Sequence, residues 1–131
     1  MTLLRPHKDL KAVITQLLIF LKNFLVEQGA TYSQVITYKE AGVAINLTGY
    51  TARLQVRSTL ESASTVVELT TANGRIVLGG AAGTITLTIS ATDTAALTAG
   101  RGVYDLELVS GSGIVTRLLQ GVATISRNVT R

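Results

Sequence analysis

Cysteine is absent from the 131-residue sequence, which excludes disulfides, thiol nucleophiles and Cys-based zinc sites. Tryptophan is also absent and aromatic residues make up only 5% of the chain, so a core must be built from Val, Leu, Ile and Ala. Histidine occurs once, at His7 in an N-terminal Arg-Pro-His-Lys run, where a chain end is expected to fray. A Ser-His-Asp triad therefore has no candidate base held in a folded site.

Charged residues are also few, at 15% of the chain against 47% hydrophobic residues. This balance is typical of a folded domain and not of a disordered chain. The net charge is +4, and the arginines are scattered along the sequence instead of forming a basic cluster. We therefore expect no nucleic-acid partner.

The motifs that carry catalysis or metal binding are missing from the sequence. Asp93, Asp105 and Glu107 lack the spacing of an EF-hand or an HExxH site. Asp105 and Glu107 share one face of an expected strand, where we interpret them as solvated carboxylates and not as a glycosidase pair. The glycine-rich run 79–83 lacks the Gly-Lys-Ser/Thr ending of a phosphate loop. The sequence thus predicts no enzyme, no catalytic residue, no metal site and no cofactor.

An amphipathic helix is predicted over residues 10–26, LKAVITQLLIFLKNFLV, with Gly29 as its stop. On a helical wheel, nine large apolar side chains fall on one broad arc. Their full burial is worth on the order of 15–25 kcal/mol before entropy is discounted. These nine residues form the predicted partner or oligomer interface: Leu10, Val13, Ile14, Leu17, Leu18, Phe20, Leu21, Phe24 and Leu25.

An apolar arc of this width needs a cover, because exposed apolar patches on monomers rarely exceed a few hundred Å². The candidate covers are the protein's own sheet, sister subunits or a partner's groove, and a membrane surface; sister subunits or a partner are favoured. A transmembrane span is disfavoured, because Lys11 and Lys22 leave only ten residues between them where about twenty are needed. A secretory signal is disfavoured as well, because no A-x-A cleavage site follows. We therefore do not expect a membrane partner.

Short segments rich in Thr and Val replace the helical pattern after Gly29. Residues 102–126 predict a long β-hairpin, because apolar residues at 104, 106 and 108 alternate with Asp105 and Glu107 before a Ser-Gly-Ser-Gly turn. Ser90 is expected to cap a helical turn that runs through Leu97. Residues 58–64 are interpreted as a polar link, and Asn73-Gly74 as a hairpin turn. Further strands are predicted over residues 30–38, 43–47, 51–57, 65–69, 75–78 and 84–89.

Seven or eight short strands with frequent turns predict a mainly β fold, an antiparallel immunoglobulin-like β-sandwich with an N-terminal amphipathic α-helix. The change of pattern after Gly29 predicts two parts. Residues 1–29 are expected to form an anchoring or oligomerisation helix, and residues 30–131 the β-sandwich domain.

The run INLTGYTARLQVR at residues 45–57 resembles a virion module of tailed phages, in the family related to the N-terminal domain of baseplate upper proteins. Residues 83–89, 103–107 and 115–121 fit the same pattern in the same order, so the resemblance covers about residues 30–131. It implies a small β-sandwich adaptor within phage particles, often joined to a larger fibre or receptor-binding part.

The resemblance implies a bacteriophage virion structural protein, an adaptor of the tail, baseplate or fibre-attachment region that is made in the host cytoplasm. Because no fibre domain follows Arg131, we expect a small assembly component and not a complete receptor-binding protein. The expected partners are other virion proteins of the tail, baseplate or capsid, together with further copies of the chain, with a trimer favoured. One alternative is a capsid decoration (cement) protein. Another, of a different class, is a polysaccharide-binding module, although such a module usually exposes an aromatic platform and aromatics are few here.

Overall fold

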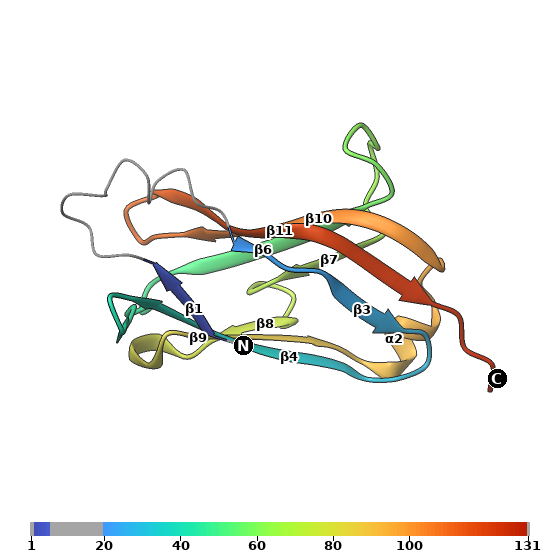
Figure 1. The fold of residues 1–131 in the computed structure, drawn as a ribbon, viewed down its shortest axis with the longest axis horizontal. Coiled ribbons are helices and arrows are strands. Elements are labelled where there is room, and N and C mark those ends of the chain that lie inside the picture. Colours follow the sequence, from blue (N-terminus) through green and yellow to red (C-terminus); the bar gives the residue numbers. More distant parts are fainter. Residues whose placement is uncertain (1, 6–19, 131) are drawn as a thin grey trace.

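The computed structural model describes residues 2–5 and 20–130. Two β-sheets face each other and enclose one hydrophobic core (Figure 1). The elements in chain order are β1 (Thr2–Arg5), β2 (Phe20–Leu21), β3 (Phe24–Glu27), β4 (Tyr32–Glu40), β5 (Val43–Ala44), β6 (Thr51–Arg57), β7 (Val67–Thr70), β8 (Ile76–Leu78), the 3₁₀ turn η1 (Gly80–Ala82), β9 (Thr84–Ile89), α2 (Ala91–Ala95), β10 (Gly100–Val109) and β11 (Val115–Ser126).

The five-stranded sheet has the order β1-β4-β9-β8, with β5 also paired to β4. The six-stranded sheet has the order β2-β11-β10-β6-β7, with β3 also paired to β11. Pairing among β4 to β11 is antiparallel, so the mainly β, antiparallel sandwich that the sequence predicts is confirmed. The N-terminal strands differ, because β1 pairs with β4, and β2 and β3 pair with β11, in parallel.

The predicted hairpin at residues 102–126 is confirmed as β10 and β11. The two strands pair from Gly100 opposite Ile125 to Val109 opposite Val115, with one register shift next to Leu106. In the turn, the Ser110 hydroxyl accepts a hydrogen bond from the Ile114 N–H at 2.9 Å, and Gly113 has a φ of +91° that few other residues adopt. The hairpin supplies two of the three interior strands of the six-stranded sheet.

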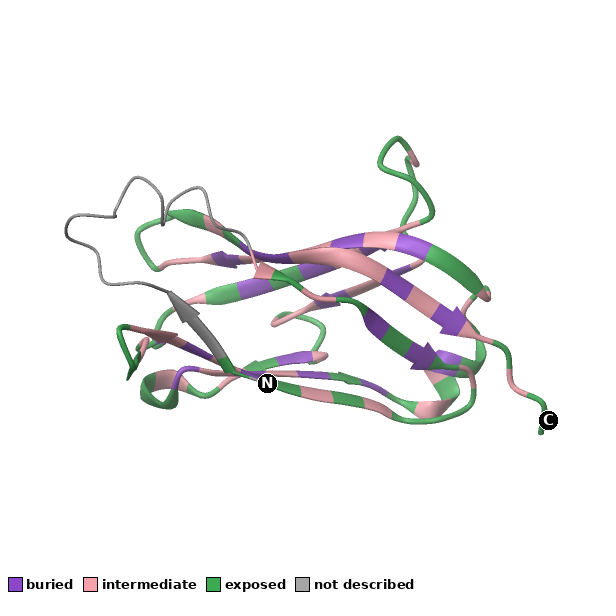
Figure 2. Ribbon diagram, in the orientation of Figure 1, coloured by how far each residue is buried: buried purple, intermediate pink, exposed green. Residues whose placement is uncertain are grey.

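The core lies between the sheets because each strand turns every second side chain inward. Ile85, Leu87 and Ile89 of β9 have exposed fractions of at most 1%, as do Leu106 and Leu108 of β10. Figure 2 shows the result as buried bands that alternate with less buried ones along the strands. The core contains no tryptophan and consists mostly of aliphatic side chains, as the composition predicts.

The predicted helix is wrong over residues 20–26, where β2 and most of β3 lie on either side of residues 22 and 23 and no helix is present. Residues 10–19 lie outside the described part of the chain. In β3, Phe24 and Val26 are buried while Leu25 and Glu27 are exposed. This alternation has the period of a strand and not of a helix.

The physical reason for the strand is the neighbouring β11, which offers a row of backbone partners along its edge. The Lys22 N–H donates to the Gln120 carbonyl at 3.1 Å, and the Gln28 N–H donates to the Ser126 carbonyl at 3.0 Å. Pairing with β11 therefore begins before the predicted boundary between residues 29 and 30.

The Asn73 turn also differs from the prediction, because it does not close a hairpin. Strand β7 pairs with β6 in the six-stranded sheet, whereas β8 pairs with β9 in the five-stranded sheet. The Asn73 side-chain oxygen accepts from the N–H groups of Thr70 and Arg75, both at 3.0 Å. This turn therefore carries the chain from one sheet to the other.

The predicted capped turn is confirmed as α2, although it ends at Ala95 and not at Leu97. The Ser90 hydroxyl accepts from the Asp93 N–H at 3.2 Å. The buried Thr94 hydroxyl donates to the Ala30 carbonyl at 2.8 Å, which fixes the turn against the connection between β3 and β4.

Candidate interaction face

The four predicted interface residues that the structure describes do not share one surface. Phe20 and Phe24 pack against the core, and Phe24 is only 7% exposed. Leu21 and Leu25 point away from the core, with exposed fractions of 76% and 55%. The other five lie outside the described residues: Leu10, Val13, Ile14, Leu17 and Leu18.

Close contacts with the hairpin hold this N-terminal segment in place. The Phe24 ring lies 4.8 Å from the Tyr104 ring and 6.2 Å from the Tyr32 ring, measured between centroids. The Tyr104 hydroxyl donates to the Lys22 carbonyl at 2.5 Å. Gly121 allows this approach because a Cβ at that position would overlap the Lys22 carbonyl oxygen and lie 2.9 Å from its carbon. The side chains of Leu21 and Leu25 are thereby fixed on the outer side of the sheet.

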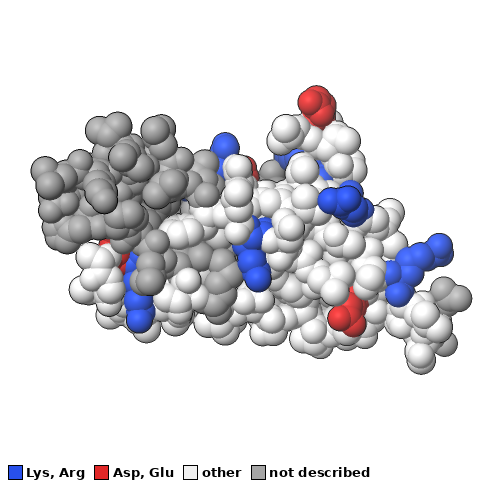
Figure 3. Space-filling model, in the orientation of Figure 1, with Lys and Arg blue, Asp and Glu red and all other residues white. Residues whose placement is uncertain are grey.

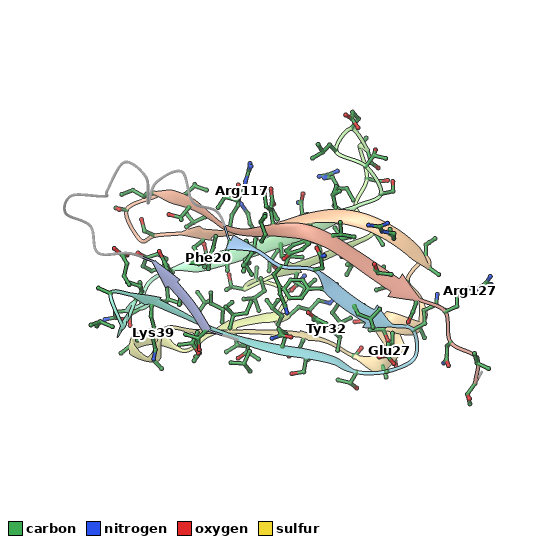
Figure 4. All side chains as sticks on the ribbon, in the orientation of Figure 1. Phe20, Glu27, Tyr32, Lys39, Arg117 and Arg127 are labelled. Carbon is green, nitrogen blue, oxygen red and sulfur yellow. The ribbon has the colours of Figure 1, made fainter. Side chains whose placement is uncertain are left out.

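The buried Tyr104 and the partly buried Tyr32 pack against Phe24 of this segment. Burial raises the pKa of both Tyr32 and Tyr104 above the usual range for a phenol. The Tyr32 hydroxyl lies between the sheets (Figure 4) and has no hydrogen-bond partner among the described residues. Both phenols stay protonated at neutral pH, so their role is packing and, for Tyr104, one hydrogen bond.

The outer face of the six-stranded sheet carries cross-strand ion pairs. Arg53 of β6 lies 2.7 Å from Glu107 of β10, and Arg117 of β11 lies 3.3 Å from Asp105. The predicted shared face of Asp105 and Glu107 is therefore confirmed, and each carboxylate has an arginine beside it. Figure 4 shows Arg117 pointing away from the sandwich. Exposed pairs of this kind are worth at most about 1 kcal/mol each, so they contribute more to the charge pattern of the face than to stability.

A hollow of about 630 Å³ crosses the outer face. It begins at Leu21 on the β2 edge and ends at Leu60 beyond β6, so its floor spans four strands, or about 14 Å at the usual strand spacing. Its apolar floor includes Val103 and Val122. The full lining is Leu21, Gln55, Arg57, Leu60, Val103, Tyr104, Asp105, Arg117, Gln120, Gly121 and Val122.

The loop of residues 58–66 rises from the sandwich beside this hollow, between β6 and β7 (Figure 1). Leu60 in this loop is 82% exposed, and the neighbouring Glu61 is exposed too. Figure 3 shows an acidic side chain at the loop tip and charges of both signs scattered over the visible face. The Arg57 guanidinium donates to the Ser62 carbonyl at 2.8 Å and to the Gln55 side-chain oxygen at 2.8 Å, which ties the loop to β6.

Arg57 and Gln55, which both line the hollow, differ in their partners. Arg57 has no carboxylate partner within the described ranges, whereas Gln55 donates to Glu68 at 2.6 Å. Tyr104 is the one aromatic residue in the lining, and it is 5% exposed. In the part of the chain that the structure describes, no three His, Cys, Asp or Glu side chains gather as a metal site requires. No helix there is long and apolar enough to cross a membrane.

The hollow and its loop are the features that sequence reasoning missed. The polar link predicted at residues 58–64 does contain a signal, since Leu60 is the only large apolar residue between Ser58 and Ser64. A lone leucine in a polar loop belongs to no apolar face of a strand or helix, so the exposure of Leu60 could have been predicted. The floor of the hollow could not have been predicted, because it combines residues of four strands that lie far apart in the sequence.

Comparison with known proteins identifies a similar fold. No family model and no curated protein matches the sequence. Among solved structures, the N-terminal domain of phage TP901-1 ORF48, a baseplate upper protein, is similar with a TM-score of 0.54. The likeness covers 95% of this chain and 96% of that chain at 12% sequence identity. It shows a shared fold, and it agrees with the resemblance found in the sequence.

Proposed function

We propose that this chain is a structural protein of a phage tail or baseplate, with the role of an adaptor between virion proteins. The observation that carries the proposal is the fold likeness to a baseplate domain over nearly the whole of both chains. The sequence resemblance at residues 45–57 supports the same context independently of overall shape. On this proposal the protein is located in the virion and its partners are other virion proteins.

The adaptor works by surface burial. Leu21 and Leu25 are fixed outward by the pairing of β2 and β3 with β11, at exposures of 76% and 55%. Exposed leucines held on a rigid sheet lose little entropy on binding, which makes them effective anchors in an interface. We therefore place the contact surface on the outer face of the six-stranded sheet, in place of the helical bundle expected from the sequence.

Proteomics of purified particles tests the assignment. The chain should be recovered with intact virions and should remain with tails after heads and tails are separated. Recovery with heads alone would support the capsid decoration alternative and overturn the tail proposal, as would absence from particles.

A matched pair of variants tests the surface. Leu21→Asp should prevent incorporation into particles while leaving the sandwich folded, because the side chain points to solvent. Val77→Asp is the control, since Val77 is 60% exposed on the other sheet. Equal incorporation of both variants would show that the contact lies elsewhere. A glycan array separates this function from polysaccharide binding, and we expect no binding because the hollow exposes no aromatic platform.

A further inference from the structure

We infer that two copies of this chain pair face to face, each placing Leu60 and Glu61 of its loop into the hollow of the other. This inference concerns self-association and does not depend on the location of the protein in a particle. It follows from three properties of the outer face: the shape of loop and hollow, their charges, and their adjacency.

The apolar match comes first. Leu60 is 82% exposed on a loop that projects beyond the sheet, and it is held there by the bond from Arg57 to the Ser62 carbonyl. The hollow has an apolar floor of Val103 and Val122, and its volume of about 630 Å³ leaves ample room for a leucine side chain. Burying a leucine in such a site is worth about 1.5–3 kcal/mol. Leu60 of one copy therefore fits the hollow of the other copy.

The charges match as well. Glu61 has no ion-pair partner among the described residues, and neither does Arg57, whose guanidinium donates only to neutral oxygens. Arg57 lines the hollow that would receive the partner's loop. The carboxylate of Glu61, one residue after the inserted leucine, would reach the wall of the hollow, where the remaining N–H groups of the Arg57 guanidinium can donate hydrogen bonds to it. Each copy thus carries both halves of the same ion pair.

The position of the loop beside the hollow determines the symmetry of the pair. The loop borders the hollow on the same face, since Leu60 itself forms one wall. Two copies related by a twofold axis can therefore make both contacts at once, with Glu61 of each meeting the partner's Arg57. The occupant that the surface fits is a second copy of this chain, and the product is a dimer.

Sedimentation equilibrium over a concentration series, with the full chain, tests the dimer. The wild type should fit a monomer–dimer equilibrium. Glu61→Arg places like charges at both symmetric contacts and should raise the dimer Kd at least about tenfold. Arg57→Glu should do the same. An equimolar mixture of the two variants should form a heterodimer of near wild-type Kd, because each contact again joins opposite charges.

The controls keep the inference open to refutation. Arg57→Glu also removes the hydrogen bond from Arg57 to the Ser62 carbonyl, so the unfolding midpoint of this variant must be measured and must equal that of the wild type. Glu61→Arg tests the contact between copies and leaves that hydrogen bond in place. Val77→Asp, on the opposite sheet, should leave the Kd unchanged. A wild type that is monomeric throughout, folded variants that fail to associate on mixing, or a Val77→Asp effect as large as that of Glu61→Arg would each overturn the inference.

Discussion

Alanine substitutions at Phe24 and, separately, at Leu25 distinguish a strand from a helix in the N-terminal segment. On a helix both side chains would belong to one apolar arc, and both substitutions would cost similar free energies. In the structure Phe24 is 7% exposed and Leu25 is 55% exposed, because they point to opposite sides of β3. The two neighbouring residues should therefore give different results.

The expected magnitudes follow from the contacts. Phe24 packs against the rings of Tyr104 and Tyr32, and removal of a buried phenylalanine side chain costs about 3–5 kcal/mol. Leu25 is 55% exposed, so its side chain makes few packing contacts. Leu25→Ala should therefore lower the unfolding free energy by at most about 1 kcal/mol. For a chain of this length, each kcal/mol lowers the melting temperature by roughly 3–4 °C. The Phe24 variant should thus melt about 10–18 °C below the wild type.

Urea unfolding followed by far-UV circular dichroism measures the difference. The slope of unfolding free energy against urea should stay the same in both variants, which would show that the change is in stability and not in the extent of unfolding. Equal losses at the two positions, or a larger loss for Leu25→Ala, would refute the strand assignment for this segment.

Three further outcomes are expected. Gly121→Ala should lower the unfolding free energy by about 1–3 kcal/mol and speed amide exchange at Lys22, because the added Cβ overlaps the Lys22 carbonyl oxygen; unchanged exchange would contradict the close approach. Leu106→Ala should cost about 2–5 kcal/mol in urea unfolding, because the side chain is fully buried, and a loss near zero would place it outside the core. Above about pH 10 the unfolding free energy should fall as pH rises, because burial raises the pKa of Tyr32 and Tyr104 and the unfolded chain then releases protons that the folded chain keeps. Tyr32→Phe should make this high-pH loss of unfolding free energy smaller. At neutral pH it should change the unfolding free energy little, because the Tyr32 hydroxyl has no partner among the described residues. Identical pH profiles for the variant and the wild type would refute this.

The strands with clear alternation were predictable from the sequence. Residues 84–89 alternate Thr with Ile or Leu, and β9 spans the same residues. The hairpin of β10 and β11 was predictable for the same reason, helped by a turn of Ser and Gly. In these segments the local pattern and the tertiary environment favour the same structure.

The N-terminal segment was not predictable in this way, because almost every residue from 17 to 26 is apolar and such a run fits both a helix and a strand. The choice is made by β11, about a hundred residues later, which provides the backbone partners. The Asn73 turn misled for a related reason. Its local chemistry specifies a reversal of the chain but not the sheet that the next strand joins.

The interaction face depended still more on tertiary structure. Its exposed leucines at 21 and 25 were predicted as contact residues, but on a helix with Phe20 and Phe24, which in fact pack inward. The hollow needs the side-by-side order of β2, β11, β10 and β6, and no local pattern encodes that order.

A reconstruction of the intact phage particle by electron cryomicroscopy tests the central claim most directly. It should place this chain in the tail or baseplate, with Leu21, Leu25 and Leu60 covered by neighbouring subunits and Val77 facing solvent. A chain seated in the tail through the five-stranded sheet, with the outer face of the six-stranded sheet open to solvent, would contradict the account.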